Sequence, residues 1–141
     1  MASILVVEKD SGICDLVVEV LEIELAAAVT CARTGAQGKN AIETGYFDLA
    51  VIDCGMPQIS GYELAEYAIN RNIPVLLYTG HPAAIAALDG HHFPHLAKPF
   101  QLHELIYTAA KIITHAADNV AQVKASFIKL RMTTDNLRSP H

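Results

Sequence analysis

The sequence predicts one α/β domain built as a doubly wound, five-stranded parallel sheet. Its length of 141 residues suits a single domain with a normal hydrophobic core. Short apolar runs alternate five times with segments of helical periodicity. The predicted strands are apolar on both faces, which is typical of parallel sheets covered by helices on both sides. Right-handed crossovers between such strands produce the doubly wound arrangement.

Each predicted strand is a short apolar run, and each is followed by a helical pattern. The strands are expected at residues 3–8, 28–33, 47–53, 73–79 and 94–97, the last of them weak. The helices are expected at residues 12–25, 35–45, 60–71 and 82–90, with a final helix from about Leu102. Ser11 is the expected cap of the first helix, and Gly45 the expected stop of the second.

Composition narrows the class of protein. Hydrophobic residues make up 52% of the chain and charged residues 18%, which argues against disorder. The net charge of −5 argues against direct binding of nucleic acid. Three cysteines, Cys14, Cys31 and Cys54, show no CxxC spacing and are expected to be reduced. With no signal peptide or membrane span in the pattern, we expect a soluble cytoplasmic protein that makes no membrane contact.

The residues that close the predicted strands suggest a phosphoryl-transfer site. In parallel sheets the carboxyl ends of the strands meet at one rim, where ligands bind. The polar residues at these ends are Glu8, Lys9, Asp10, Asp53, Thr79 and Lys98. Carboxylates bind Mg²⁺, while a hydroxyl and an ammonium group bind phosphoryl oxygens. An aspartate, here Asp53, is able to accept the phosphoryl group as an acyl phosphate.

Four stretches of the chain resemble a known family. They are "ILVVEKD", "FDLAVIDCGMPQISGYEL", "PVLLYTG" and "LAKPF". They look like the successive motifs of response-regulator receiver domains of two-component signalling, which are CheY-like, and the resemblance extends over roughly residues 3–115. It implies a flavodoxin-like fold with strand order 2-1-3-4-5. It also implies a phosphohistidine donor on a histidine kinase or phosphotransfer protein, and a downstream protein target.

The resemblance also implies roles for individual residues. Asp53 matches the phosphoacceptor, Thr79 the switch hydroxyl and Lys98 the lysine of the KPF motif, with a cis bond before the proline. Glu8 matches the first of a pair of acids. Together with Asp53 and the backbone carbonyl of Gly55, it would hold Mg²⁺. The only chemistry implied is phosphorylation and dephosphorylation of the chain itself at Asp53, with no separate catalytic output domain.

Lys9 departs from the family pattern, because it stands where the second acid belongs. Asp10 lies one residue further on, and only a rearranged loop would bring its side chain into the site. The Lys9 ammonium would lean over Asp53 as a built-in cation, or stay in solvent and weaken metal binding, or mark a receiver that signals without phosphate. A fourth interpretation is an exposed loop lysine without a role. We expect weakened Mg²⁺ binding and slower phosphorylation.

The segment between Thr79 and Lys98 also departs from the pattern. His95 takes the place of the aromatic switch residue, and an imidazole is smaller and titratable. The segment is short, so the helix predicted at 82–90 is expected to be clipped. His91, His92 and His95 have no standard metal-ligand spacing and are interpreted as part of a solvated loop.

The C-terminal part is compositionally separate. We divide the chain into a receiver domain, residues 1–117, and a helical extension with a frayed end, residues 118–141. Residues 118–141 carry two acids and four bases. Apolar residues continue at heptad spacing over 102–130. This stripe predicts a homodimer through residues 102–130, with folding back onto the domain as the rival.

Two function classes remain after this comparison of motifs. The first is a stand-alone response regulator that is phosphorylated on Asp53 and signals by protein–protein contact. The second is a receiver-like adaptor that works without phosphate because Lys9 replaces a metal-binding acid. An aspartate-nucleophile phosphatase ranks lower, because Gly55 stands where that class has its second acid. A flavin-binding protein ranks lowest, since no phosphate-cradling loop follows the first strand.

Overall fold

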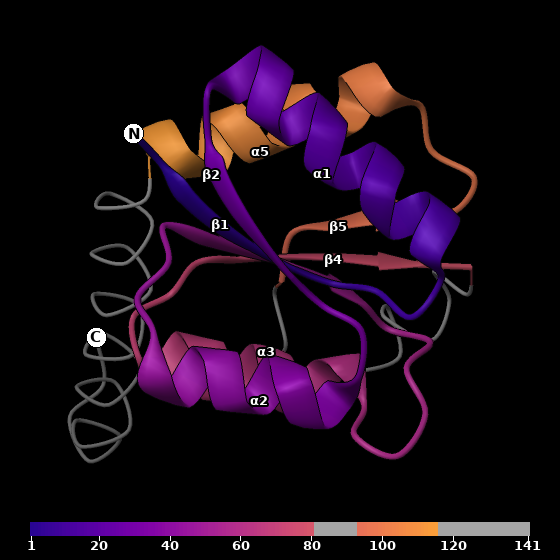
Figure 1. Ribbon diagram of the computed structural model, residues 1–141, viewed down its shortest axis with the longest axis vertical. Coiled ribbons are helices and arrows are strands. Elements are labelled where there is room, and N and C mark those ends of the chain that lie inside the picture. Colours follow the sequence, from indigo (N-terminus) through magenta and orange to yellow (C-terminus); the bar gives the residue numbers. More distant parts are fainter. Residues whose placement is uncertain (81–92, 116–141) are drawn as a thin grey trace, which may run out of the picture.

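The computed structural model describes residues 1–80 and 93–115. Within these residues the chain forms a five-stranded parallel sheet with the order β2-β1-β3-β4-β5, enclosed by two layers of helices (Figure 1). The fold class and the strand order expected from the sequence are therefore confirmed. The helix predicted at 82–90, His91 and His92, and the extension 118–141 lie outside the described residues.

The elements lie close to their predicted positions. The strands are β1 (Ser3–Val7), β2 (Ala28–Ala32), β3 (Leu49–Asp53), β4 (Val75–Thr79) and β5 (His95–Ala97). The helices are α1 (Ser11–Leu25), α2 (Gly35–Thr44), α3 (Gly61–Asn70) and α5 (Leu102–Thr114). β1 and β2 end one residue before their predicted ends, whereas β3, β4 and β5 begin one or two residues after their predicted starts.

Alternate residues of each central strand enter two separate cores. Ile4 and Val6 of β1 pack under α1 and α5, whereas Leu5 and Val7 pack against α2 and α3. Figure 1 shows these two helix pairs on opposite faces of the sheet. β3 and β4 are buried along their whole length, as the apolar runs predicted. β2 is partly exposed, because it lies at the edge of the sheet.

The last described helix packs on the sheet through one stripe. Leu105, Ala109 and Ile112 of α5 are buried against the core beneath α1. These are the positions expected of a helix that covers the sheet. The homodimer predicted through residues 102–130 depends mainly on positions beyond His115, outside the described part of the chain, and it stays a prediction.

Two expectations about α1 and its surroundings were wrong. The N-cap is Asp10, not Ser11: Asp10 has extended backbone angles and its Oδ1 accepts the Ile13 N–H at 3.0 Å, while Ser11 is already helical. Cys14 and Cys31, expected as free thiols, form a disulfide with a Cα–Cα distance of 6.9 Å. The pairing follows from the packing of α1 beside β2, which brings together residues separated by 17 positions. Only Cys54 is free among the cysteines.

No helix in the described ranges, 1–80 and 93–115, is long and apolar enough to cross a membrane.

Candidate functional site

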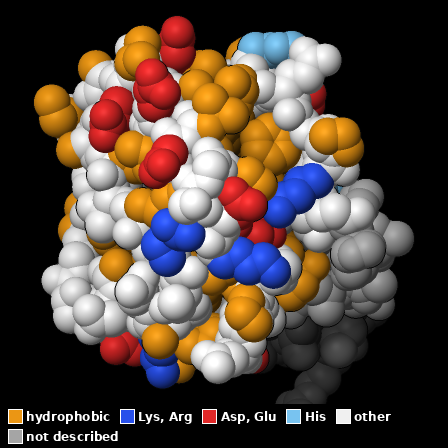
Figure 2. All heavy atoms as spheres, turned by 45° about the vertical axis from the view of Figure 1, so that its right-hand side comes forward, with side chains coloured by type: hydrophobic (Ala, Val, Ile, Leu, Met, Phe, Trp, Pro, Cys, Tyr) orange, Lys and Arg blue, Asp and Glu red, His pale blue; other side chains and the backbone are white. Residues whose placement is uncertain are grey.

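Four of the predicted site residues meet at the carboxyl ends of the strands. Glu8, Asp53 and Thr79 are almost fully buried, although their side chains are polar. Asp53, Thr79 and Lys98 line a pocket of about 350 Å³, and Glu8 lies behind it within 4.0 Å of the Lys98 ammonium. Its lining residues are Lys9, Asp53, Cys54, Gly55, Tyr62, Thr79, Gly80 and Lys98. Figure 2 shows this end of the molecule, where Lys and Arg side chains surround a small group of acidic ones.

Two of the contacts that hold Asp53 meet at one of its two carboxylate oxygens. The Lys98 ammonium lies 3.2 Å from Asp53 Oδ1, and the Gly55 N–H donates to the same oxygen at 2.9 Å. Asp53 ends β3, and Thr79 ends β4 beside it. The Lys98 backbone N–H donates to the Thr79 carbonyl at 2.7 Å, which fixes the start of the lysine side chain at the rim. The predicted cis peptide between Lys98 and Pro99 is present.

Glu8 is the most enclosed acid of the site. The Tyr78 hydroxyl donates to Glu8 Oε1 at 3.0 Å, and the Asp10 N–H donates to Oε2 at 3.2 Å. The Lys98 ammonium lies 4.0 Å from Oε1. Burial raises the pKa of the Glu8 carboxyl, and the neighbouring Asp53 carboxylate raises it further, against the lowering effect of the Asp10 hydrogen bond. The two acids are therefore close enough to repel, which is the arrangement that a cation relieves.

Tyr78 belongs to the site although the sequence analysis did not single it out. Its ring is fully buried and contacts the Phe100 ring edge-on. The Lys98 ammonium lies over the face of the Tyr78 ring, 4.8 Å from the ring centroid. Burial and the nearby Glu8 carboxylate raise the pKa of the Tyr78 hydroxyl, which keeps it protonated as a donor. The signal was available in "PVLLYTG", because a phenol inside a buried strand requires a polar partner.

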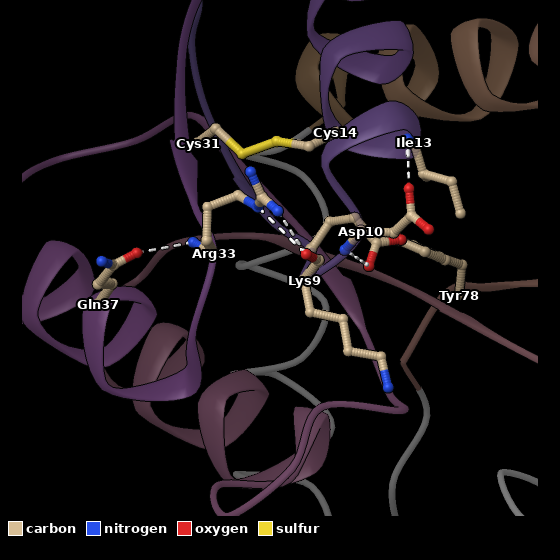
Figure 3. Close-up of a disulfide and its surroundings, with 9 residues drawn as sticks. Lys9, Asp10, Ile13, Cys14, Cys31, Arg33, Gln37 and Tyr78 are labelled. Carbon is tan, nitrogen blue, oxygen red and sulfur yellow. Dashed lines mark hydrogen bonds between the residues drawn. A yellow bond between two sulfur atoms is a disulfide. The ribbon is translucent and has the colours of Figure 1, made fainter.

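Lys9 reaches the pocket, but it contacts a carbonyl in place of the Asp53 carboxylate. Its ammonium lies 3.5 Å from the Gly55 backbone oxygen on the exposed side of the site. The Arg33 guanidinium holds the Lys9 carbonyl through hydrogen bonds of 2.6 Å and 3.3 Å (Figure 3). Arg33 follows β2, and the sequence does not predict its part in the site, because the atom that it contacts is a backbone oxygen 24 residues away. Asp10 caps α1 and does not replace the missing acid.

The loop after β3 is positioned by close backbone contact. A Cβ at Gly61 would lie 2.7 Å from the Cys54 Cα and 2.9 Å from the Asp53 carbonyl oxygen, so only glycine fits there. α3 thus begins directly against the acid-bearing loop, with Ser60 as its cap. Cys54 is partly buried by this packing, and burial raises the pKa of its thiol to about 11.

His95 lies away from the carboxylates. It is exposed at the start of β5, where its backbone pairs with Leu77, and its Nδ1 lies 3.4 Å from the Phe93 carbonyl oxygen. Its expected part in a switch with Thr79 stays a prediction.

The donor atoms of the site are of the type that Mg²⁺ prefers, but the net charge of the surrounding side chains does not favour a cation. Two carboxylates and the Gly55 carbonyl supply the oxygen ligands that this ion prefers. Against them stand the ammonium groups of Lys9 and Lys98, so the formal charges of the four side chains cancel. Within residues 1–80 and 93–115 there is no cluster of three or more His, Cys, Asp or Glu side chains able to hold a metal ion. A cation bound between Glu8 and Asp53 would therefore share the site with Lys9.

Comparison with known proteins places these features in a family. The profile of the response regulator receiver domain matches residues 4–110. The chain is 34% identical over 107 residues to the response regulator protein PmrA of Pseudomonas aeruginosa, covering 72% of this chain and 48% of PmrA. It therefore spans about half the length of this curated relative.

Solved structures agree with the sequence comparison. A CheY-like receiver domain from Methanospirillum hungatei superposes with a TM-score of 0.74 at 25% identity, covering 84% of this chain and 98% of that one. The response regulator TrrA from Thermotoga maritima, solved in complex with Mg²⁺ and BeF, superposes with a TM-score of 0.72 at 27% identity, covering 79% and 99%.

Proposed function

Because the chain belongs to the response regulator receiver domain family of two-component signalling, we propose that Asp53 accepts a phosphoryl group and that the phosphorylated chain signals through protein contacts. One observation carries this proposal: the Asp53 carboxylate is buried at a strand end, yet it lines an open pocket beside Lys98 and Thr79. A buried acid that serves only stability would be enclosed by its partners. Here the pocket leaves room for a phosphoryl group.

The transfer follows from the contacts of Asp53. Lys98 and the Gly55 N–H both engage Oδ1, so Oδ2 is the oxygen that attacks phosphorus. A P–O bond to Oδ2 forms as the P–N bond of a phosphohistidine breaks, and the departing imidazole nitrogen takes up a proton. The Lys98 ammonium and the Thr79 hydroxyl, which line the same pocket, would bind the phosphoryl oxygens as negative charge gathers on them.

We propose that Glu8, Asp53 and the Gly55 carbonyl hold Mg²⁺, and that Lys9 weakens this binding. The ion would supply positive charge that neutralises the phosphoryl oxygens during transfer. Lys9 opposes the ion by repulsion and by its contact with the Gly55 oxygen, which is one of the three ligands.

Partners and location follow from the family and remain proposals. The donor would be a histidine kinase or a phosphotransfer protein in the cytoplasm, and the receiver of the signal a downstream protein. The division at residue 117, the homodimer through 102–130 and the stand-alone organisation stay predictions.

Intact-mass analysis after incubation with a small acyl-phosphate donor tests the proposal. We expect a gain of roughly 80 Da, one phosphoryl group, that requires Mg²⁺. Asp53→Asn should abolish the gain. Asp15→Asn, which changes an exposed aspartate of α1, should leave it intact. A gain that persists in Asp53→Asn would overturn the assignment.

The contact between Lys9 and Gly55 also supports a second function, an adaptor that works without phosphate. In that case the Lys9 ammonium stays beside the Gly55 carbonyl, on the side of the pocket where the metal ion would bind. No adduct with or without Mg²⁺, in a folded protein, would favour the adaptor. Lys9→Asp would then show whether restoring the acid restores phosphorylation.

A further inference from the structure

The Cys14–Cys31 disulfide lies next to the loop that carries Lys9. Cys14 is in the first turn of α1 and is buried, with 2% of its surface exposed. Cys31 is in β2, the edge strand, and is partly exposed. The bond therefore fastens the beginning of α1 to the edge of the sheet, and its Cys31 end belongs to a residue that solvent partly reaches.

The same region holds the β1–α1 loop in place by two further contacts. Arg33 lies two residues after Cys31 and projects from the same side of the chain, toward α1. Its guanidinium binds the Lys9 carbonyl, while Asp10 caps α1 four residues before Cys14. Figure 3 shows the disulfide, Arg33 and the Lys9 backbone as neighbours on one side of β2. The disulfide, the guanidinium and the cap thus act on the same short loop.

We propose that Cys14 and Cys31 form a reversible thiol–disulfide pair, and that its oxidation state controls the Lys9 loop and hence the phosphorylation of Asp53; the second half of this inference rests on the proposed function. In the oxidised protein, α1 is tethered to β2 and the Lys9 ammonium stays at the Gly55 carbonyl. In the reduced protein the tether is gone. The loop then gains freedom, and Lys9 can withdraw from the pocket.

The redox step balances with a small-molecule disulfide, RSSR, as the oxidant. The sulfur of Cys31, the more exposed of the two residues, loses its proton, attacks RSSR and releases one thiolate. The Cys14 sulfur, also deprotonated, then displaces the second thiolate and closes the protein disulfide. The two cysteines lose two electrons and two protons, and RSSR leaves as two RSH. Reduction by a small thiol runs through the same mixed disulfide in reverse.

Thiol counting tests the first half of the proposal. The protein is equilibrated with oxidised or reduced glutathione, quenched with acid, unfolded in guanidinium and alkylated. We expect one alkyl group after oxidation, on Cys54, and three after reduction. The Cys54→Ser variant should carry no alkyl group after oxidation and two after reduction. Three groups in both conditions would mean that the pair does not form, and one group in both would mean a permanent structural bond; either result overturns the switch.

Phosphorylation rates test the second half. We expect the reduced protein to be phosphorylated about fivefold faster than the oxidised protein, a coupling at the low end of those measured between linked sites. Cys31→Ser should behave as the reduced protein in both conditions. Equal rates for the two redox forms of the wild type would overturn the coupling.

A readout without any phosphoryl donor separates failure of this inference from failure of the proposed function. Amide NMR shifts of Lys9, Asp10 and Gly55 should differ between the oxidised and reduced forms, and should be unchanged by glutathione in Cys31→Ser. If neither form is phosphorylated but these shifts respond to redox state, the proposed function fails and control of the loop stands. If phosphorylation occurs and the shifts of Lys9 and Gly55 are insensitive to redox state, the loop mechanism is wrong.

Discussion

Replacing Lys9 by glutamine should strengthen Mg²⁺ binding, because it removes a positive charge beside the proposed ligands. Glutamine keeps most of the side-chain length and can still donate a hydrogen bond to the Gly55 carbonyl. The substitution therefore isolates the charge of Lys9 from its packing. Lys39→Gln is the matched control, since Lys39 is a lysine of α2 whose ammonium lies 4.0 Å from Glu43.

The size of the effect follows from the geometry. The Lys9 ammonium lies 3.5 Å from the Gly55 oxygen, and Mg²⁺ bound to the same oxygen would lie at about 2.1 Å from it. The two charges are then about 4.5 Å apart, and a single and a double charge repel there by about 2 kcal/mol in water. This corresponds to roughly tenfold to thirtyfold tighter binding in Lys9→Gln at low ionic strength. Screening at 0.15 M salt should reduce the gain to about fivefold.

Isothermal titration with Mg²⁺ at two ionic strengths measures this gain, and the Gly55 amide shift reports the site. We expect Lys39→Gln to bind within twofold of the wild type. Equal affinities for Lys9→Gln and the wild type at low salt would refute the electrostatic reasoning. A gain that does not fall with salt would show that Lys9 acts by occupying space, not by its charge.

Three further substitutions or probes address the rest of the site. Gly61→Ala should destabilise the protein by about 1–3 kcal/mol in urea unfolding and slow phosphorylation, because the added Cβ would lie 2.9 Å and 2.7 Å from backbone atoms of Asp53 and Cys54. Gly80→Ala is the control: an added Cβ there has no neighbouring atom within 4 Å, so stability should change by less than about 0.5 kcal/mol. Glu8→Gln should stabilise the protein at pH 7 by on the order of 1 kcal/mol. The raised pKa of Glu8 means that the folded state binds this proton more tightly, so stability is greatest below the ordinary carboxyl pKa and is lost as pH rises through the folded value. The gain should therefore vanish in unfolding measurements near pH 4, and a gain independent of pH would contradict this cause. The pKa of the Cys54 thiol is about 11, so little of it is in the reactive thiolate form at pH 8. Cys54 should therefore react with iodoacetamide at pH 8 about a hundredfold more slowly than in the unfolded protein. Similar rates in the two states would show that the thiol is not buried.

The order of the elements was predictable from local pattern, because apolar runs and helical periodicity reflect burial that every βα unit repeats. Because parallel strands end at one rim, the sequence also predicts that Asp53, Thr79 and Lys98 lie together, and these three residues line one pocket. The sequence does not distinguish the cap of α1, because Ser11 and Asp10 are both good capping residues. The backbone angles that choose between them depend on how β1 leads into the helix.

The sheet, its flanking helices and the acids and lysines at its rim follow from the amino-acid sequence, since these depend on spacing along the chain. Packing in three dimensions sets which atoms meet: Tyr78 contacts Glu8, Lys9 the Gly55 carbonyl, Arg33 the Lys9 carbonyl and Cys14 the Cys31 sulfur. These contacts join residues up to 70 positions apart, and several of them involve backbone atoms that every residue carries. The spacing of residues along the chain does not reveal these partners, because they depend on how α1, β2, the loop after β3 and β4 pack around the end of β1.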